Sequence, residues 1–255
     1  MIKEFLKKKL SVVERKHLEN TIKDVKALFT GRNLNKLGRI YKSDKAGDHN
    51  YTPHYMTHFK KFRCRKVKLF EIGVGGYENP YWGGESLRMW RRYFPFGKIF
   101  SIDIYEKSVH QEKRIKIFKG SQVDRELLNT IFDEIGEMDI IIDDGSHLNE
   151  HVIESFKILF PKVKDGGIYV IEDTQTSYWE DHGGNSTDLN NPNTMMNFFK
   201  GMADSLNNQE FILPGYQQSY YDKNVISLHF YHNLIFVYKG NNDEKSNAIF
   251  NNQKK

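Results

Sequence analysis

Two acidic segments stand where apolar runs of the sequence end. The run MDIIIDDGSH carries Asp143, Asp144 and His147 at its end, and the run GIYVIEDT carries Glu172 and Asp173. Carboxylates at the ends of neighbouring strands repel each other unless a cation lies between them. Oxygen ligands of this kind suit a hard ion such as magnesium, manganese or calcium. The pattern therefore predicts a divalent-metal site.

His147 lies three residues after Asp144, in the loop beyond the apolar run. A histidine beside a metal-bound hydroxyl can take up its proton, because its pKa lies near working pH, and the metal lowers the pKa of the hydroxyl. A lone histidine is more often structural, but beside paired acids we interpret His147 as catalytic. Glu71 ends another strand-like run, VKLFEI. It is a candidate third metal ligand, or else it orients the glycine turn after it.

That turn continues from Glu71 through Gly73 and Gly75, where glycines let the backbone approach a ligand closely. The full dinucleotide fingerprint needs a third glycine where Glu78 stands, so the pattern argues against a nicotinamide enzyme. Asp103 ends the run KIFSID, where a carboxylate can accept both ribose hydroxyls of an adenosine. Residues 122–124 supply polar groups after the next strand, where an adenine edge can be read.

From Val67 onward, strand-like runs alternate with helical segments. This alternation predicts an α/β fold with a doubly wound parallel sheet, whose ligands bind beyond the carboxyl ends of the strands. Residues 177–194 read as a long loop, which at this length is usually functional or disordered, and residues 195–206 as a helix. The run VISLHFYHNLIFVYK predicts a C-terminal hairpin with its turn at His232 and Asn233.

The first residues carry apolar side chains at helical spacing, and this spacing predicts a helix over 2–29. Those positions are Leu6, Leu10, Val13, Leu18, Ile22, Val25 and Phe29. We predict an N-terminal helical or lid segment over 1–60, a catalytic core over 61–240 and a flexible tail over 241–255.

The composition narrows the class of protein. The chain of 255 residues has a formal net charge of +5. This excess favours anionic partners, but it is explained equally well by a basic surface that only contacts solvent. A single cysteine excludes an intrachain disulfide and a cysteine-based metal site. The charged start lacks the apolar core of a signal peptide, and no segment is apolar enough to span a bilayer. We therefore expect a cytoplasmic protein.

Several segments together resemble one family. They are LFEIGVGGYENPYWGGESLRMWRRYFP, SIDIYEKS, IIIDDGSHLNEHVIESFKILFP and GGIYVIEDTQTSYW, preceded by KLGRIYKSDKAGDHNYTPHYMTHF. From Leu37 to Trp179 the chain is similar to the metal-dependent macrolide-sugar O-methyltransferases of the mycinamicin type, which are class I S-adenosylmethionine-dependent methyltransferases. The resemblance implies a Rossmann-like fold with a mostly parallel seven-stranded sheet flanked by helices and an antiparallel C-terminal hairpin. It also implies S-adenosylmethionine as methyl donor and Mg²⁺ (or Mn²⁺) as a metal that holds two substrate oxygens.

The resemblance also implies roles for individual residues. It makes Asp144, Asp173 and, less directly, Glu71 the metal ligands, and His147 the general base acting with Asp144. Residues implied to contact the methyl donor are Glu71, Gly73, Gly75, Asp103, Gln122, Asp124 and Asp143. Thr52, His54 and Tyr55 of the segment YTPHY are implied to line the site near the donor or acceptor.

The implied reaction is methylation of a sugar hydroxyl. The Lys-, Asn- and Ile-rich composition suits an AT-rich bacterial genome, so we expect a nucleotide-linked sugar or a capsule precursor, such as a heptose, rather than a macrolide. The expected partners are this small molecule and further copies of the chain, with no nucleic acid and no membrane. Alternatives are a catechol or amine acceptor, a metal-dependent hydrolase, and a nucleic-acid-binding module. The last lacks a base-stacking motif beside its basic N-terminal helix.

Overall fold

The computed structural model describes residues 10–250 and 253–254. Residues 1–121 and 122–255 form two compact units, called here the N-terminal and the C-terminal unit. The seven strands of the main sheet follow the order β3-β2-β1-β4-β5-β7-β6. Within this sheet, the strand pairs described inside each unit are parallel except those made by β7. The predicted mostly parallel seven-stranded sheet is confirmed, and so is the antiparallel C-terminal hairpin.

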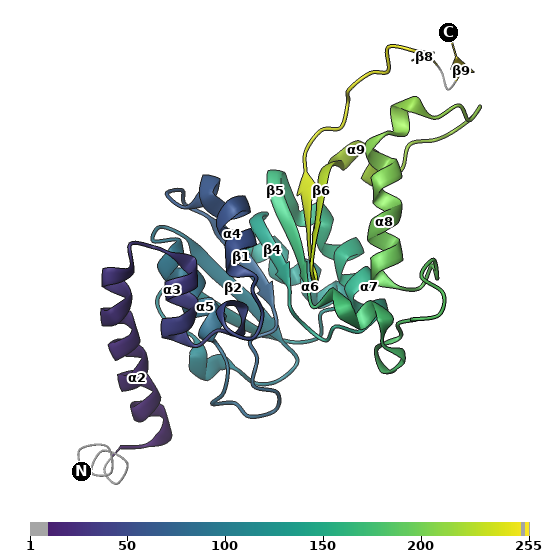
Figure 1. The fold of residues 1–255 in the computed structure, drawn as a ribbon. Helices are drawn as coiled ribbons and strands as arrows, with labels where there is room; N and C mark the ends of the chain where they lie inside the picture. Colours follow the sequence, from purple (N-terminus) through teal and green to yellow (C-terminus); the bar gives the residue numbers. More distant parts are fainter. Residues whose placement is uncertain (1–9, 251–252, 255) are drawn as a thin grey trace. The chain divides into compact units, whose positions relative to one another are not determined.

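In residues 10–121, the described part of the N-terminal unit, three parallel strands are accompanied by the helices α2 to α5; Figure 1 labels these helices. The strands are β1 (Lys68–Ile72), β2 (Lys98–Asp103) and β3 (Ile115–Lys119), and the helices are α2 (Val12–Ala27), α3 (Leu34–Tyr41), α4 (Thr52–Phe59) and α5 (Glu85–Tyr93). Helix α3 packs against α2, α4 and α5. Its hydrophobic positions recur at helical spacing, so Leu34, Leu37 and Tyr41 are all buried.

The C-terminal unit is built around β4 (Met138–Asp143) and β5 (Val163–Glu172), which pair in parallel. Strand β7 (Leu234–Lys239) pairs antiparallel with β5 and with β6 (Val225–Tyr231). The helices are α6 (Arg125–Ile135), α7 (Asn149–Leu159), α8 (Met195–Leu206) and α9 (Tyr220–Asn224). Residues 140–142 and 168–171 are almost wholly apolar and buried, as expected for strands covered on both faces.

The hairpin joining β6 and β7 turns where the sequence predicts it. Tyr231 pairs with Leu234, and Asn233 adopts a left-handed backbone with φ 60°. Asparagine tolerates this conformation better than most residues, which explains its place in a two-residue turn.

The predicted first helix is shorter than expected, and its apolar positions point outward. Helix α2 begins after the capping-box residue Ser11, which exchanges hydrogen bonds with Glu14. The expected position Leu6 lies outside the described residues. The exposed apolar positions are Val13, Leu18, Ile22, Val25 and Phe29. Helical spacing alone predicts which residues share a face, but it does not say what covers that face.

Two segments expected to be irregular contain short regular elements, and the flexibility predicted for the tail stays a prediction. The segment expected as a long loop contains two 3₁₀ turns, Thr174–Tyr178 and Glu180–His182. The segment expected as a flexible tail contains the short strands β8 (Ile249–Phe250) and β9 (Gln253–Lys254), which pair with each other. The predicted boundaries at residues 60 and 240 do not coincide with the two compact units and stay predictions. No described helix has the length and apolar character required to cross a membrane.

Candidate active site

The structure brings together Asp144, His147 and Asp173. Strands β4 and β5 run in parallel, with Asp143 opposite Ile171, so the residues that follow them emerge at the same edge. The Nε2 atom of His147 lies 3.9 Å from Oδ1 of Asp144 and 3.6 Å from Oδ2 of Asp173. Each side chain offers one ligand atom, and these atoms lie within 4.8 Å of one another. Two carboxylates at this spacing are hard oxygen donors that a divalent ion can bind, and the imidazole beside them is placed to exchange a proton.

The backbone of this acidic site is held in an unusual conformation. His147 has φ 55° and Asp173 has φ 53°, both in the left-handed region that side-chain-bearing residues rarely occupy. The hydroxyl of Thr176 donates hydrogen bonds to the carbonyl oxygens of His147, at 2.8 Å, and of Asp173, at 3.2 Å. One side chain thereby fixes both loops, which is how strained backbone persists at a functional site.

A buried polar network lies beneath the loop that follows β4. Asp143 is 1% exposed, and its carboxylate accepts hydrogen bonds from Ser155 at 2.5 Å and Gln122 at 3.2 Å. The amide oxygen of Gln122 in turn accepts from the backbone N–H of Ser146 at 2.8 Å. Burial raises the pKa of Asp143 to about 6, and the hydrogen bond from Ser155 opposes this rise. The network ties the end of β4 to the loop that carries His147.

Three residues expected to contact a methyl donor have internal partners here. Asp143 and Gln122 bind each other. Asp124 is exposed and caps α6, accepting from the N–H of Leu127 at 3.0 Å. Capping residues and donor-binding residues draw on the same polar side chains, so residue type alone cannot separate the two roles. Direct donor contact by these three residues stays a prediction.

The glycine turn after β1 is anchored by Asp103 at the end of β2. One carboxylate oxygen of Asp103 accepts from the N–H of Val74 at 2.9 Å, and the other from the N–H of Tyr105 at 2.9 Å. Gly73 and Gly75 have φ values of 92° and 82°, which favour glycine. The structure thus places Asp103 against the glycine turn, and contact of either with a methyl donor stays a prediction.

The rest of the turn folds back on itself. A Cβ at Gly83 would lie 2.3 Å from the carbonyl oxygen of Gly75, so no larger residue fits. The buried Lys107 donates from Nζ to the carbonyls of Asn79, at 2.8 Å, and Trp82, at 3.1 Å. These bonds hold the segment between the glycines and α5 in one shape.

Glu71 is buried and bound within the N-terminal unit. Its Oε2 accepts from Ser86 at 3.0 Å and from the indole N–H of Trp90 at 3.1 Å, and its Oε1 lies 3.4 Å from the ammonium of Lys45. Lys45 is 1% exposed, so each of these two buried charges is stabilised by its attraction to the other. The role of Glu71 as a metal ligand stays a prediction.

Of the YTPHY residues, Tyr55 packs against Trp90, the residue whose indole binds Glu71. The ring of Tyr55 packs 5.0 Å from Trp90 and 4.9 Å from Phe59, measured between ring centroids, so this ring belongs to the aromatic core. Thr52 is buried and accepts from the amide of Asn35 at 3.2 Å, and His54 is partly exposed on α4. Contact of these residues with a donor or acceptor also stays a prediction.

Two more residues shape the acidic site: Glu172, which the sequence pattern included in the acidic segment without a role of its own, and Asn149, which it missed. Glu172 is buried, and one of its carboxylate oxygens lies within 4.8 Å of one of Asp144. Asn149, 1% exposed, donates to the carbonyls of Thr176, at 3.0 Å, and His182, at 2.9 Å, and accepts from the N–H of Met195 at 2.7 Å. Glu172 was visible as the acid beside Asp173. No local pattern marks Asn149, because its partners lie far along the chain.

Comparison with known proteins gives this geometry a context. The chain is 46% identical to the mycinamicin VI 2''-O-methyltransferase of Micromonospora griseorubida, over 83% of this chain and 53% of that protein. It is also 46% identical to the demethylmacrocin O-methyltransferase of Streptomyces fradiae, over 83% of this chain and 54% of that protein. No family model matches the chain.

A solved structure agrees with these relatives. The MycE methyltransferase of the mycinamycin biosynthetic pathway, in complex with Mg and SAH, superposes with a TM-score of 0.81 and 46% identity over 84% of this chain and 55% of that one. The chain is a homologue of the macrolide-sugar O-methyltransferases. The expected class I methyltransferase fold is confirmed by this homologue, and the resemblance in the sequence is confirmed as homology. The chain spans about half the length of the relatives it matches.

Proposed function

We propose that this homologue of the macrolide-sugar O-methyltransferases transfers a methyl group from S-adenosylmethionine to a sugar hydroxyl with the help of a divalent metal. The observation that carries the proposal is the cluster of Asp144, His147 and Asp173, held on strained backbone at the ends of β4 and β5. The relatives named as O-methyltransferases, and the solved relative in complex with Mg and SAH, support it.

The residues present fit both groups. Asp144 and Asp173 supply hard oxygen donors for Mg²⁺ or Mn²⁺, with Glu71 or Glu172 as a further candidate. A bound divalent ion would lower the pKa of an acceptor hydroxyl. The glycine turn and Asp103 present a backbone cradle and a carboxylate to the nucleoside of the donor, which supplies an electrophilic methyl group.

The protein's own residues have defined tasks in this reaction. His147 takes the proton of the acceptor hydroxyl at its imidazole, because Nε2 faces the two acids. The hydroxyl oxygen bonds to the methyl carbon as the carbon–sulfur bond of the donor breaks. Thr176 and Asn149 hold the surrounding loops in place and so fix the approach of the acceptor.

The acceptor we propose is a nucleotide-linked sugar or a polysaccharide precursor, such as a heptose. Residues 1–121 hold 28 Lys and Arg against 12 Asp and Glu, which supports an acceptor carrying phosphate.

We also propose that the chain forms a homo-oligomer, supported by the apolar side chains exposed on α2.

The proposal is tested first by donor binding. Calorimetric titration with S-adenosylhomocysteine, with Mg²⁺ present, is expected to give saturable binding that Asp103→Asn weakens by about tenfold or more, since a charged acceptor is lost. Glu106→Gln is the matched control. Glu106 is an exposed acid three residues further along, and its substitution removes the same charge. Methyl transfer to sugar nucleotides is then followed by mass spectrometry with and without a chelator.

The outcomes separate the alternatives. Donor binding without any transfer that depends on metal would favour an amine acceptor. Absence of donor binding by the folded chain would overturn the proposal and favour a metal-dependent hydrolase.

A further inference from the structure

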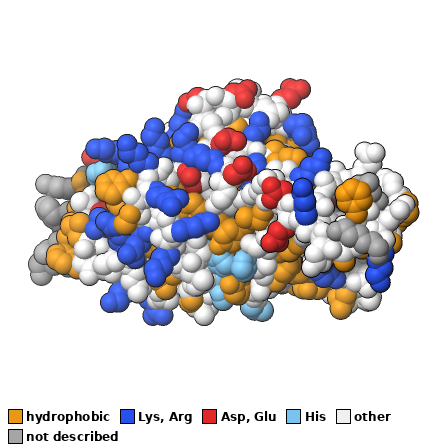
Figure 2. All heavy atoms as spheres, turned by 90° about the horizontal axis from the view of Figure 1, so that it is seen from above, with side chains coloured by type: hydrophobic (Ala, Val, Ile, Leu, Met, Phe, Trp, Pro, Cys, Tyr) orange, Lys and Arg blue, Asp and Glu red, His pale blue; other side chains and the backbone are white. Residues whose placement is uncertain are grey.

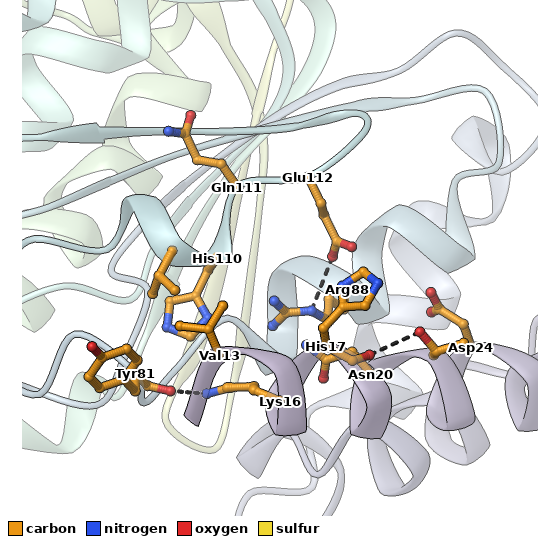
Figure 3. Close-up of a pocket in the computed structure, with 12 residues that line it drawn as sticks. Val13, Lys16, His17, Asn20, Asp24, Tyr81, Arg88, His110, Gln111 and Glu112 are labelled. Atoms are coloured by element: carbon orange, nitrogen blue, oxygen red, sulfur yellow. Dashed lines mark hydrogen bonds and ion pairs between the residues drawn. The ribbon is translucent and has the colours of Figure 1, made fainter. Parts of the chain in front are cut away.

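The N-terminal unit contains a cavity whose lining residues have no role in the proposed reaction. It has a volume of about 200 Å³ and lies between α2, α5 and the 3₁₀ turn Ser108–His110 (Figure 3). We call it the α2 cavity. Its lining residues are Val13, Lys16, His17, Asn20, Thr21, Asp24, Tyr81, Arg88, Val109, His110, Gln111 and Glu112.

His110 is the buried group of the α2 cavity that lacks a partner. Its side chain is 1% exposed, and the Pro80 carbonyl interacts with the ring but lies outside hydrogen-bonding geometry, as does every other described acceptor and donor. Figure 3 shows its ring between Val13 and Lys16 of α2 and the head of Arg88. A buried polar ring without a partner is costly unless a ligand, ion or water satisfies it. The ring therefore marks a place where a ligand is expected.

The groups around this ring are mostly positive. Lys16, half-buried on α2, donates to the carbonyl of Tyr81 and forms no ion pair with a described carboxylate. The guanidinium of Arg88 is 5% exposed and donates to the carbonyl of Gly84 at 3.0 Å. Burial, followed by the positive charges of Lys16, Arg88 and Lys107, lowers the pKa of His110 to about 3, and the Pro80 carbonyl opposes this only weakly. The ring is therefore neutral and offers one N–H donor.

The acids of the α2 cavity are already neutralised. Glu112 lies 3.0 Å from Nε of Arg88 and 2.9 Å from Nη1 of Arg91. Asp24 lies 2.6 Å from Nη2 of Arg91 and accepts a hydrogen bond from the hydroxyl of Tyr41 at 2.5 Å. Arg88 and Arg91 together balance these two acids, so Lys16 is the cation beside His110 that has no carboxylate partner among the described residues.

The charge of the whole unit acts in the same direction. Residues 1–121 hold 28 basic and 12 acidic side chains, and residues 122–255 hold 10 and 21. In Figure 2 the Lys and Arg side chains gather on the left, where Figure 1 places α2 and α3. A positive field of this kind raises the local concentration of anions.

We propose that the α2 cavity binds a phosphate group through Lys16, Arg88 and the ring N–H of His110. Three donors on three elements suit a tetrahedral oxyanion better than a planar carboxylate. The cavity is larger than one phosphate, and Val13, Tyr81 and Val109 supply apolar surface for an organic portion. Val13 and Tyr81 are 47% and 40% exposed, so the cavity is reached from solvent.

Calorimetry on the whole chain tests this site, with inorganic phosphate in one arm and glucose 6-phosphate in the other. We expect saturable binding that Lys16→Gln weakens about tenfold, since one charge-assisted hydrogen bond is lost. Lys26→Gln is the matched control, because Lys26 is an exposed lysine on the same helix that does not line the cavity. Tighter binding of the sugar phosphate would show that the apolar walls contact its organic portion, and equal binding would show a site for the phosphate group alone.

A second measurement follows the ring itself. Bound phosphate should raise the pKa of His110, seen as a shift of its imidazole NMR titration, with His110→Gln identifying the signal. The proposal is overturned if neither probe saturates, or if Lys26→Gln weakens binding as much as Lys16→Gln. Binding of S-adenosylhomocysteine is measured on the same samples. A sample that binds S-adenosylhomocysteine but not phosphate contradicts the phosphate site alone, and one that binds phosphate but not S-adenosylhomocysteine contradicts the proposed methyl transfer alone.

Discussion

At the scale of single residues, the acidic site depends on a few oxygen atoms brought within reach of one ion. Asp144 and Asp173 come from separate strands, and the imidazole of His147 lies between them at 3.6 to 3.9 Å. Two carboxylates so close to each other and to a solvent-accessible edge are stabilised by a bound cation. Removal of either acid should therefore affect metal binding before it affects folding.

Asp173→Asn is the first test at this scale. The substitution keeps the size of the side chain and removes one charged ligand, so affinity for Mn²⁺ should fall at least about tenfold. Titration calorimetry measures this, with Asp188→Asn as the control because Asp188 is an exposed acid of the same connecting segment. Equal Mn²⁺ affinity in the wild type and in Asp173→Asn would remove Asp173 from the metal site.

Sequence patterns identified the acids and the histidine because strand ends can be located from apolar runs. Asp144, His147 and Asp173 follow such runs directly, and parallel pairing carries them to one edge. The same reasoning could not show that Gln122 and Asp143 bind each other, since 21 residues separate them. Nor could it show that Lys45 is buried against Glu71, because no local pattern places a lysine in a core.

At the scale of elements, the connection after β5 is held more firmly than a free lid. Asn149, the first residue of α7, bonds to Thr176, His182 and Met195. These partners belong to the two 3₁₀ turns and to the start of α8, so a single amide joins three elements. The composition of residues 177–194 predicts irregular backbone, but only the folded arrangement shows what fixes it.

Asn149→Ala should release this connection. Loss of the amide leaves two buried carbonyls and one N–H without partners, a cost of about 1–3 kcal/mol in the free energy of unfolding. Hydrogen exchange should rise over residues 174–195, and kcat should fall because the acceptor is less well oriented. Glu150→Ala, at the exposed neighbouring position, is the control. Unchanged exchange in Asn149→Ala would show that other contacts hold the connection.

At the scale of the whole molecule, basic and acidic side chains are unevenly distributed along the chain. The balance is 28 to 12 in residues 1–121 and 10 to 21 in residues 122–255. A net charge of +5 conceals this division. Composition alone indicates only a weak preference for anions, whereas the folded N-terminal unit concentrates cations around one buried imidazole.

That imidazole links the stability of the whole chain to pH. The pKa of His110 is lowered from 6.5 to about 3 in the folded state, so between these values the unfolded chain binds the additional proton. The contribution of His110 to stability is fully present above pH 6.5 and is lost as the pH drops through this value. Its slope approaches about 1.4 kcal/mol per pH unit, and the part lost between pH 7 and pH 5 is about 2 kcal/mol. Asp143, whose raised pKa acts in the opposite direction, offsets part of this loss in the wild type, so the contribution is measured as the difference between the wild type and a variant without the ring, by urea unfolding at both pH values in phosphate-free buffer.

His110→Gln removes the titrating ring while keeping a polar side chain of similar reach. The difference in unfolding free energy between pH 7 and pH 5 should then shrink by about 2 kcal/mol relative to the wild type. His17→Gln, an exposed histidine that also lines the α2 cavity, should leave the difference unchanged. An equal pH dependence in the wild type and in His110→Gln would mean that the ring is protonated or solvated in the folded chain, and the positive field inferred around it would be wrong.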